Sequence, residues 1–307
     1  MKKFFKSFWR VITWPFRTLF RIIVWPFMMI KKSIAFLNTD VEDRPILDTF
    51  SNLATESDAR ASFWEHIEAL RIHLFRMLIA LAICVGISFY FAKPLMAFLA
   101  EPVGGLDKLQ AIEVTEELGV FMRVALTSGI AIAFPYLAFE IWLFAAPGLN
   151  SREKKNTLFG IPVAVLLFLS GMAFTYIILI PPALVFLSGF TAIKADWAAK
   201  DYFGFITGLM LWIGAFFEFP LVIYVLTSLG FVKPQILLKQ WRLAVVIIAI
   251  IAAAVTPTVD PINMSLVMLP MIALYFISIG MSQLAYAARK RNMAAEETTE
   301  ETAEETS

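Results

Sequence analysis

Six long, almost uncharged apolar runs constrain this 307-residue chain more than any other feature of its sequence. A helix that crosses a bilayer needs about 20 mostly apolar residues. The runs cover about residues 74–92, 118–140, 158–180, 203–229, 243–256 and 264–286. Apolar residues make up 59% of the chain, which is more than one soluble domain could bury. The sequence therefore predicts an integral membrane protein, and excludes an ordinary soluble enzyme, a disordered chain and a secreted disulfide scaffold.

In lipid, the backbone polar groups of such runs must be satisfied internally, so we expect helices. A β-barrel is excluded because the runs do not alternate apolar and polar residues. The fifth run has only 13 residues before Thr256 and Pro257, and spans about 20 Å as a helix against about 30 Å of hydrocarbon. It either crosses a locally thinned bilayer or is re-entrant. Taken as a crossing, it gives an all-α integral membrane protein with six transmembrane helices and both termini on one side.

The distribution of Lys and Arg gives the orientation. The connections before the first run and after the second, fourth and sixth runs are basic, and the others are poor in cations. The connection at 93–117 carries five carboxylates against two lysines. Short basic connections stay on the cytoplasmic side, so both termini are expected to be cytoplasmic.

Four regions follow from this pattern. Residues 1–37 repeat VITWPF as IIVWPF among basic residues, which is typical of an amphipathic segment on the anionic lipids of a membrane surface. A signal peptide or a seventh span is disfavoured, because arginines interrupt every apolar stretch. Residues 38–62 are expected to be a polar linker, 63–288 the membrane domain, and 289–307 a basic stop followed by an acidic, disordered tail.

Ionisable residues inside the runs are candidates for function, because they are costly in lipid. They are Glu218, Glu140 and Arg123. Each could instead be an internally satisfied group that fixes helix packing, and for Glu218 we favour a function. His66 and His73 are expected at surface positions of a helix. With one cysteine, Cys84, and no nucleotide or metal motif, neither a disulfide, a cofactor, a metal, an enzymatic activity nor nucleic-acid binding is expected.

Five motifs, in order, resemble those of the TatC family, the core receptor subunit of the twin-arginine (Sec-independent) protein translocase. The resemblance covers about residues 63–288. The motifs are EHIEALRIHL at 65–74, AEPV at 100–103, FPYLAFEIWLFAAPGLNSREKK at 134–155, GAFFEFPLV at 214–222 and VTPTVDPINMSLVMLPMIALYF at 255–276.

The resemblance implies a cupped bundle of six transmembrane helices, with short fifth and sixth helices, in a prokaryotic plasma (inner) membrane. It implies recognition of twin-arginine signal peptides at the cytoplasmic face and export of folded proteins, driven by the proton-motive force. The implied partners are TatA- and TatB-like single-span proteins, other TatC copies and the signal peptides themselves.

Carboxylates suit a ligand with two arginines, because a guanidinium forms bidentate bonds with them. By resemblance the site comprises Glu153 in the connection after the second run, and Glu68, Arg71 and Glu65 before the first. The opening motif departs from the family pattern, since Ala69 stands where the family has Glu. Glu68 or Glu65 could compensate, or this part of the site is weakened. Phe276, where many relatives have Glu, and the basic extension also mark a divergent member.

Further positions carry roles implied by the resemblance. Glu218 and Glu140 are assigned to an intramembrane polar pocket, where Glu218 meets a polar residue of a partner helix or of the inserted signal hairpin. Structural roles fall to Pro102, Pro147, Pro220, Pro257 and Asp260. For Asp260, a turn-forming role before Pro261 is favoured over a direct function.

Two other functions remain open at this stage. A small ion-coupled transporter would use Glu140 and Glu218, but it predicts internal repeats, and none is convincing between 63–178 and 179–288. A non-transporting membrane scaffold would leave Glu153 and Glu218 replaceable.

Overall fold

The computed structural model describes residues 57–146, 157–158, 160–189, 197–256 and 260–305. The chain divides into two units, one of residues 1–60 and 145–158 and the other of residues 61–144 and 159–307. Most of the first unit lies outside the described residues. The basic extension 1–37, nearly all of the linker, Pro147, Glu153 and Pro257 are therefore outside the described part, and the helices below belong almost wholly to the second unit.

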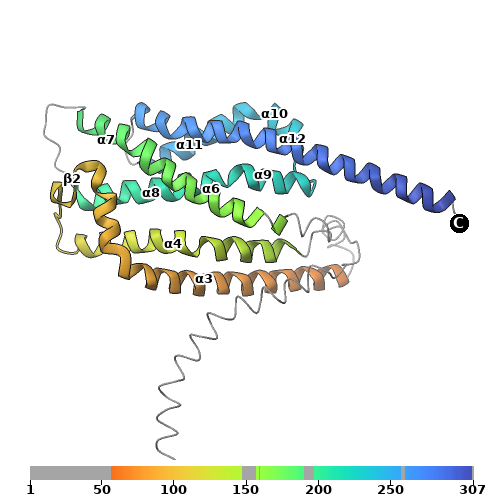
Figure 1. Cartoon of the computed structure of the whole chain (residues 1–307), viewed down its shortest axis with the longest axis horizontal. Coiled ribbons are helices and arrows are strands. Elements are labelled where there is room, and N and C mark those ends of the chain that lie inside the picture. Colours follow the sequence, from red (N-terminus) through yellow and green to blue (C-terminus); the bar gives the residue numbers. More distant parts are fainter. Residues whose placement is uncertain (1–56, 147–156, 159, 190–196, 257–259, 306–307) are drawn as a thin grey trace, which may run out of the picture. The chain divides into compact units, whose positions relative to one another are not determined.

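The second unit is built of helices joined by short connections (Figure 1). In chain order the elements are α3 (Ser57–Leu99), η1 (Glu101–Val103), η2 (Leu106–Lys108), β1 (Leu109–Gln110), α4 (Glu116–Ala145), α6 (Gly160–Phe174), the π-helical turn η4 (Thr175–Leu179), α7 (Ile180–Gly189), β2 (Trp197–Ala198), α8 (Ala199–Phe217), α9 (Phe219–Ser228), α10 (Pro234–Lys239), α11 (Trp241–Val255) and α12 (Pro261–Glu305). The only strands among the described residues are these two residue pairs, so the expected all-α class is confirmed.

The expected membrane-crossing runs appear as long apolar helices. By length and composition, five helical segments can cross a membrane: Ile67–Val103, Glu116–Ala145, Gly160–Gly189, Ala199–Ser228 and Pro261–Arg291. The fifth run forms a shorter apolar helix, α11, of 15 residues. At 1.5 Å per residue α11 is about 22 Å long, which agrees with the expectation of a short fifth helix.

The structure differs from three expectations about where helices begin and end. The sixth helix is not short, because α12 runs for 45 residues. It continues beyond Arg291 through Glu305, where we expected a disordered tail. The physical reason is that a helix already held by packing needs no new nucleus, and the Ala and Glu of the tail extend it readily. Likewise α3 begins at Ser57, within the expected linker.

Prolines break two of the spans. Pro181 and Pro182 in α7 lack amide hydrogens, and the turn just before them, η4, is π-helical, with five residues. Pro220 follows the turn at Glu218 that separates α8 from α9. Glu218 therefore sits at an interruption of the fourth span, where backbone geometry departs from a regular helix.

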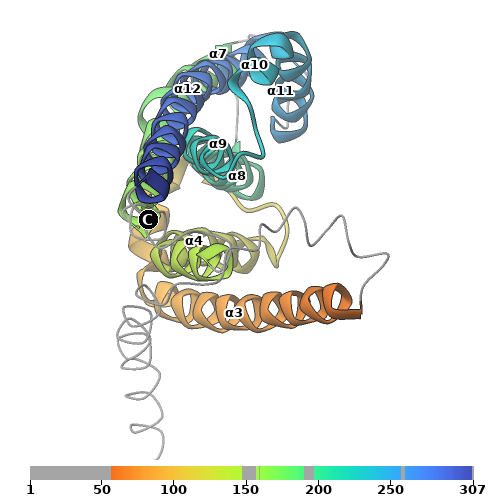
Figure 2. The ribbon, with the colours of Figure 1, turned by 90° about the vertical axis from the view of Figure 1, so that its right-hand side faces the viewer.

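The described core is centred on α8. Tyr202, Phe203 and Ile206 are almost completely buried among side chains of α4, α7, α11 and α12. On its other side α8 approaches α6 closely, since a Cβ built on Gly171 would lie 2.8 Å from the Cα of Gly214. Small residues at such a crossing allow the close packing that drives helix association in lipid. Figure 1 shows α9 continuing the line of α8, and both Figure 1 and Figure 2 show α3 beside α4.

The C-terminal helix packs along α9. The buried hydroxyls of Thr227 and Ser282 are 2.8 Å apart and join α9 to α12, and Tyr275 donates a 2.7 Å hydrogen bond to the Leu237 carbonyl in α10. After α9 the chain turns at Gly230, whose φ of +85° favours glycine. The Arg289 guanidinium occupies the space that a Cβ on Gly230 would need. The backbone conformation is the reason that glycine is favoured there, because the flexible Arg289 side chain can move aside.

Candidate functional site

Polar residues gather at the two ends of the second unit and at two places between them. We call the end that carries Arg71, Lys233, Lys239, Arg242 and Arg289 the basic end. The opposite end, with Glu101, Asp107, Glu113, Glu116 and Glu117, is the acidic end. Basic and acidic residues thus lie at opposite ends of the second unit, as the charges of the connections in the sequence predict.

At the basic end, α3 exposes Glu68 and Arg71 of the opening motif. Arg71 Nη1 lies 3.2 Å from Glu68 Oε1, and the two side chains are 78% and 58% exposed. An exposed ion pair three residues apart on a helix contributes only about 0.2–1 kcal/mol. Glu68 and Arg71 can therefore give up their ion pair and bind a ligand instead at a small cost in free energy. Ala69 is half-buried, and Glu65 lies on the same helix.

Further along α3 and α4, Glu140 is enclosed by hydrogen-bond partners. Its side chain is 1% exposed, Tyr136 donates to Oε1 at 2.5 Å, and His73 Nδ1 lies 2.5 Å from Oε2. The surface position expected for His73 is therefore wrong, since its side chain is only 16% exposed. His73 lies on the face of α3 that packs on α4. The sequence of α3 alone does not show which of its faces packs on another helix.

Glu218 has a different environment, at the interruption between α8 and α9. Its carboxyl group is half-buried and lies near the backbone of Phe168 in α6. Its Oε1 atom is buried and has no hydrogen-bond partner within the described part of the chain. A buried acceptor without a partner costs free energy, so this atom favours a donor supplied from elsewhere. Within the described part of the chain, no hydrogen bond or ion pair joins Glu218 to Glu140.

Arg123 lies in the second turn of α4 from the acidic end, and its side chain is exposed. Its guanidinium lies against Gly204 of α8, where a Cβ would displace it. The glycine thus makes room for an arginine between α4 and α8.

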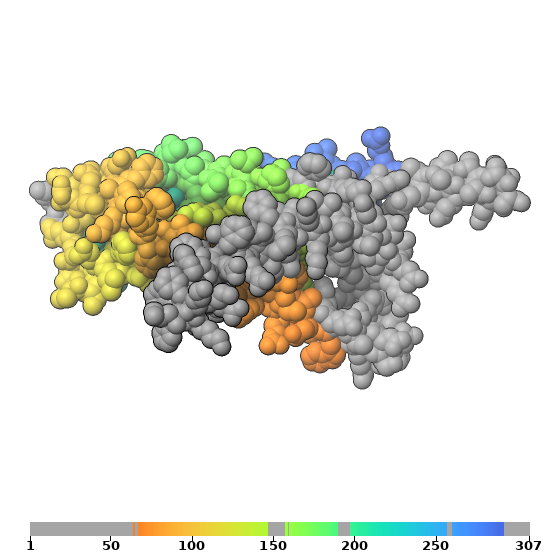
Figure 3. Space-filling model, turned by 60° about the horizontal axis from the view of Figure 1, so that its bottom comes forward, coloured from red at the N-terminus to blue at the C-terminus, as the bar shows by residue number. Residues whose placement is uncertain are grey.

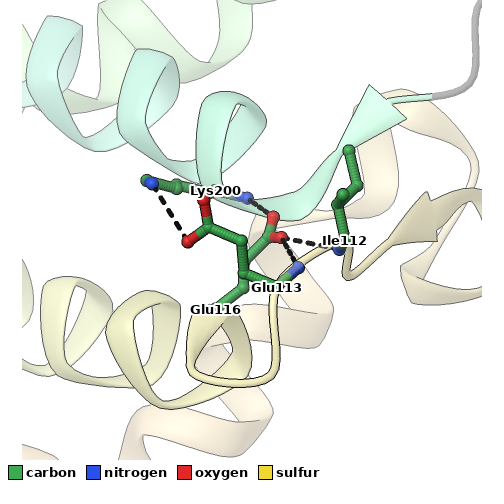
Figure 4. A network of polar contacts seen from close by, with 4 residues as sticks. All are labelled: Ile112, Glu113, Glu116 and Lys200. Atoms are coloured by element: carbon green, nitrogen blue, oxygen red, sulfur yellow. Dashed lines mark hydrogen bonds and ion pairs between the residues drawn. The ribbon is translucent and has the colours of Figure 1, made fainter.

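A network of polar contacts ties the two connections of the acidic end together (Figure 4). Glu116 accepts hydrogen bonds from the backbone amides of Ile112 at 2.7 Å, Glu113 at 3.2 Å and Lys200 at 2.6 Å. The Lys200 ammonium also lies 3.4 Å from Glu113. Because Lys200 is in the first turn of α8, Glu116 caps that helix from another segment, and the positive helix end favours its carboxylate.

Three more contacts fix the first connection. Strands β1 and β2 pair in parallel, and the Tyr202 and Tyr176 hydroxyls donate to the carbonyls of Leu99 at 2.8 Å and Phe98 at 2.6 Å. Pro102 lies in η1 within this connection. Figure 3 shows the rest of this connection and the start of α4 (yellow) on one face beside the end of α3 (orange).

Asp260 begins the sixth span as a cap. Its Oδ1 accepts the Asn263 amide at 2.7 Å, and its Oδ2 accepts the Asn263 side chain at 3.0 Å. These bonds satisfy the start of α12, which agrees with the turn-forming role favoured for this residue.

The sequence reading missed the partners that complete these sites. His73 and Tyr136 were not connected with Glu140, and the Glu113–Glu116–Lys200 network was not foreseen. The spacing of Tyr136 and Glu140, four residues apart on one helix, was an available signal. The other partners are distant in sequence, so no local pattern marks them.

This arrangement defines the class of protein: a multi-pass helical membrane protein whose polar side chains sit at the helix ends and at helix interruptions. Among the described residues, no group of His, Cys, Asp and Glu could hold a metal ion.

Comparison with known proteins identifies the family. The model of the Sec-independent protein translocase protein (TatC) family matches residues 65–270, about two thirds of the chain. The chain belongs to the TatC family, and the sequence-based assignment is confirmed.

Individual relatives agree. The chain is 34% identical over 239 residues to the Sec-independent protein translocase protein TatCy of Bacillus subtilis, covering 76% of this chain and 94% of that protein. It is 35% identical to TatC of Aquifex aeolicus, covering 74% and 96%. A crystal structure of the twin-arginine translocase receptor TatC superposes with a TM-score of 0.66 at 33% identity, covering 72% of this chain and 99% of that one. The chain is therefore a protein translocase component in a membrane.

Proposed function

We propose that this protein recognises twin-arginine signal peptides at the cytoplasmic face, and nucleates an assembly that exports folded proteins, driven by the proton-motive force. The observation that carries the proposal is the exposed Glu68–Arg71 pair at the basic end of a TatC-family chain. A carboxylate that is accessible and only weakly paired can bind a guanidinium without first losing a stronger bond. Glu153, in the connection after α4, is the second carboxylate of the proposed site, and Glu65 assists the first.

Glu218 is proposed to act after recognition, inside the membrane. Its buried oxygen without a partner favours a hydrogen-bond donor from a second chain. We infer that this donor comes from a TatA- or TatB-like single-span helix or from the inserted signal hairpin. Glu140 belongs to the same layer of intramembrane polar groups, with its own partners already present.

The remaining proposed partners are further copies of this chain and anionic lipids, which the basic extension 1–37 would bind on the cytoplasmic leaflet. Binding that weakens with salt and is absent on neutral vesicles would support the lipid contact. Because transport would use the proton-motive force and the partner helices, no enzymatic step is assigned to this chain.

Export of a reporter tests the proposal directly. The reporter is fused to a twin-arginine signal, in cells whose only TatC-family protein is this one and which contain the TatA- and TatB-like partners. We expect Glu153→Ala combined with Glu68→Ala to lower export at least about tenfold, because both arginines lose a charged acceptor. Glu218→Ala is expected to lower export while peptide binding at the basic end persists.

The control is Glu117→Ala, an exposed carboxylate at the acidic end, which should leave export unchanged. Full export by the Glu68→Ala, Glu153→Ala protein at normal expression would contradict the proposed recognition site. Export that survives Glu218→Ala would contradict the intramembrane role.

A further inference from the structure

Helix α3 is the least enclosed of the long apolar helices. Only 6% of the residues in its most apolar stretch are buried inside the molecule, against 28–39% in the other four. Few protein contacts therefore fix the position of α3. Each of these contacts has a large influence on where the helix lies.

Contacts near the middle and the acidic end form a crossing between α3 and α4. A Cβ on Gly129 would lie 2.7 Å from the Cα of Val85, so the backbones touch there. The adjacent hydroxyls of Ser88 and Ser128 hydrogen-bond across the same crossing. Closer to the acidic end, Phe89 and Phe121 stack with their centroids 5.6 Å apart. These contacts make the crossing a pivot.

Toward the basic end, the His73–Glu140 contact holds the two helices together. From the crossing, 12 residues of α3 lead to His73, about 18 Å, and 11 residues of α4 lead to Glu140, about 17 Å. A contact that far from a pivot controls the separation of the helix ends much more strongly than a contact beside the pivot. Beyond it, α3 carries Glu68 and Arg71 within the next one and a half turns.

The surroundings make this contact a strong one. Glu140 is 1% exposed and is held by Tyr136 from its own helix, and the Phe144 ring packs edge-on against the His73 imidazole, with centroids 6.2 Å apart. Arg76 of α3 lies close enough to act electrostatically on Tyr136. A buried carboxylate that loses one of its donors is left with an unsatisfied charge, which is costly.

We propose that His73 and Glu140 form a latch that holds the basic-end arms of α3 and α4 at a fixed separation, and so positions Glu68 and Arg71 for a signal peptide. His73 and Glu140 are positioning residues in this proposal, and the ligand is bound by other groups. The functional half rests on the proposed signal-peptide recognition. The structural half does not rest on it, because the separation of the basic-end segments of α3 and α4 can be measured whether or not a peptide binds there.

Distance measurement between spin labels tests the structural half. Cys84, the one cysteine, is replaced by Ser, and labels are placed at Leu70→Cys on α3 and Ile141→Cys on α4, both of which are exposed. The full chain is measured in lipid nanodiscs by pulsed electron resonance. We expect one narrow distance distribution with His73 present, and a longer and broader one in His73→Phe, which keeps a ring but cannot donate.

Matched variants separate the latch from general loosening. His73→Gln keeps an N–H donor and should restore the narrow distribution. Adding Glu140→Leu to His73→Phe should not widen the distance distribution further, because the single variant has already removed the only contact that the two residues share. Ser88→Ala, at the pivot, should leave it unchanged. If His73→Phe does not fold, His73→Ala is measured with the same labels.

A twin-arginine peptide bound to the same nanodiscs gives the functional readout. We expect His73→Phe to weaken binding about tenfold, which is about 1.4 kcal/mol, and His73→Gln to restore it. An unchanged label distance in His73→Phe would overturn the latch. A changed distance with unchanged peptide affinity would keep the latch but contradict its link to recognition. No binding even with His73 present would contradict the proposed function and leave the distance result standing.

Discussion

Buried polar side chains in this protein find their partners in two different ways. Five buried threonines donate to the carbonyl four residues earlier in their own helix: Thr127, Thr175, Thr207, Thr227 and Thr256. The buried carboxylates Glu116 and Glu140 have local partners and, in addition, a partner from a distant segment, Lys200 and His73 respectively. The half-buried Glu218 keeps one oxygen without a partner in the described chain. Carboxylates are therefore the residues whose environment depends on the tertiary structure.

At the residue scale, Glu116 gives a sharp prediction. Glu116→Ala removes the acceptor of the Ile112, Glu113 and Lys200 amides at once. We expect faster amide hydrogen exchange at these three residues and a lower melting temperature. Glu117→Ala, at an exposed neighbouring position, is the control and should change neither quantity. Equal exchange rates in the two variants would show that the network does not hold the connections together.

The sequence identified the ionisable residues inside the apolar runs, because a charged side chain inside lipid costs free energy and is therefore rare. Glu140 and Glu218 were found because a charge in an apolar run is rare. Their surroundings were not found, since the second partner of Glu140, His73, lies 67 positions earlier in the chain. For the same reason His73 was expected at the surface: helical periodicity gives a face, but it does not say which helix covers that face.

At the element scale, helix crossings depend on single small residues. Gly171 and Gly214 let α6 and α8 approach so closely that a Cβ at 171 would lie 2.8 Å from the Gly214 Cα. We expect Gly171→Ala to destabilise the folded protein by about 1–3 kcal/mol, because backbone cannot move aside as a flexible side chain can. Thermal or chemical unfolding in detergent measures this change.

The matched control for that crossing is Gly280→Ala in α12, where a Cβ would meet nothing within 4 Å. It should be neutral or slightly stabilising, because Ala favours helix over Gly. Equal stability of the two variants would contradict the close packing of α6 on α8.

At the scale of the whole molecule, the separation of charge into a basic and an acidic end predicts the orientation in the membrane. In a Cys84→Ser background, Val114→Cys in the acidic connection and Gln240→Cys at the basic end are both exposed. A membrane-impermeant maleimide should label only Val114→Cys in intact spheroplasts, and Gln240→Cys after lysis. The opposite pattern would reverse the proposed orientation.

The sequence by itself determined the class, the number of apolar helices, the short fifth helix and the family. These properties follow from local composition, since a run of apolar residues in lipid must form a helix. Helix α12 is longer than the sequence predicted. The reason is that a helix continues into the tail from the packed segment before it. Only the tertiary structure decided which groups meet: Glu140 with His73, Glu116 with Lys200, and the unpartnered oxygen of Glu218. Such contacts join positions far apart in the chain, and their existence depends on how the helices cross.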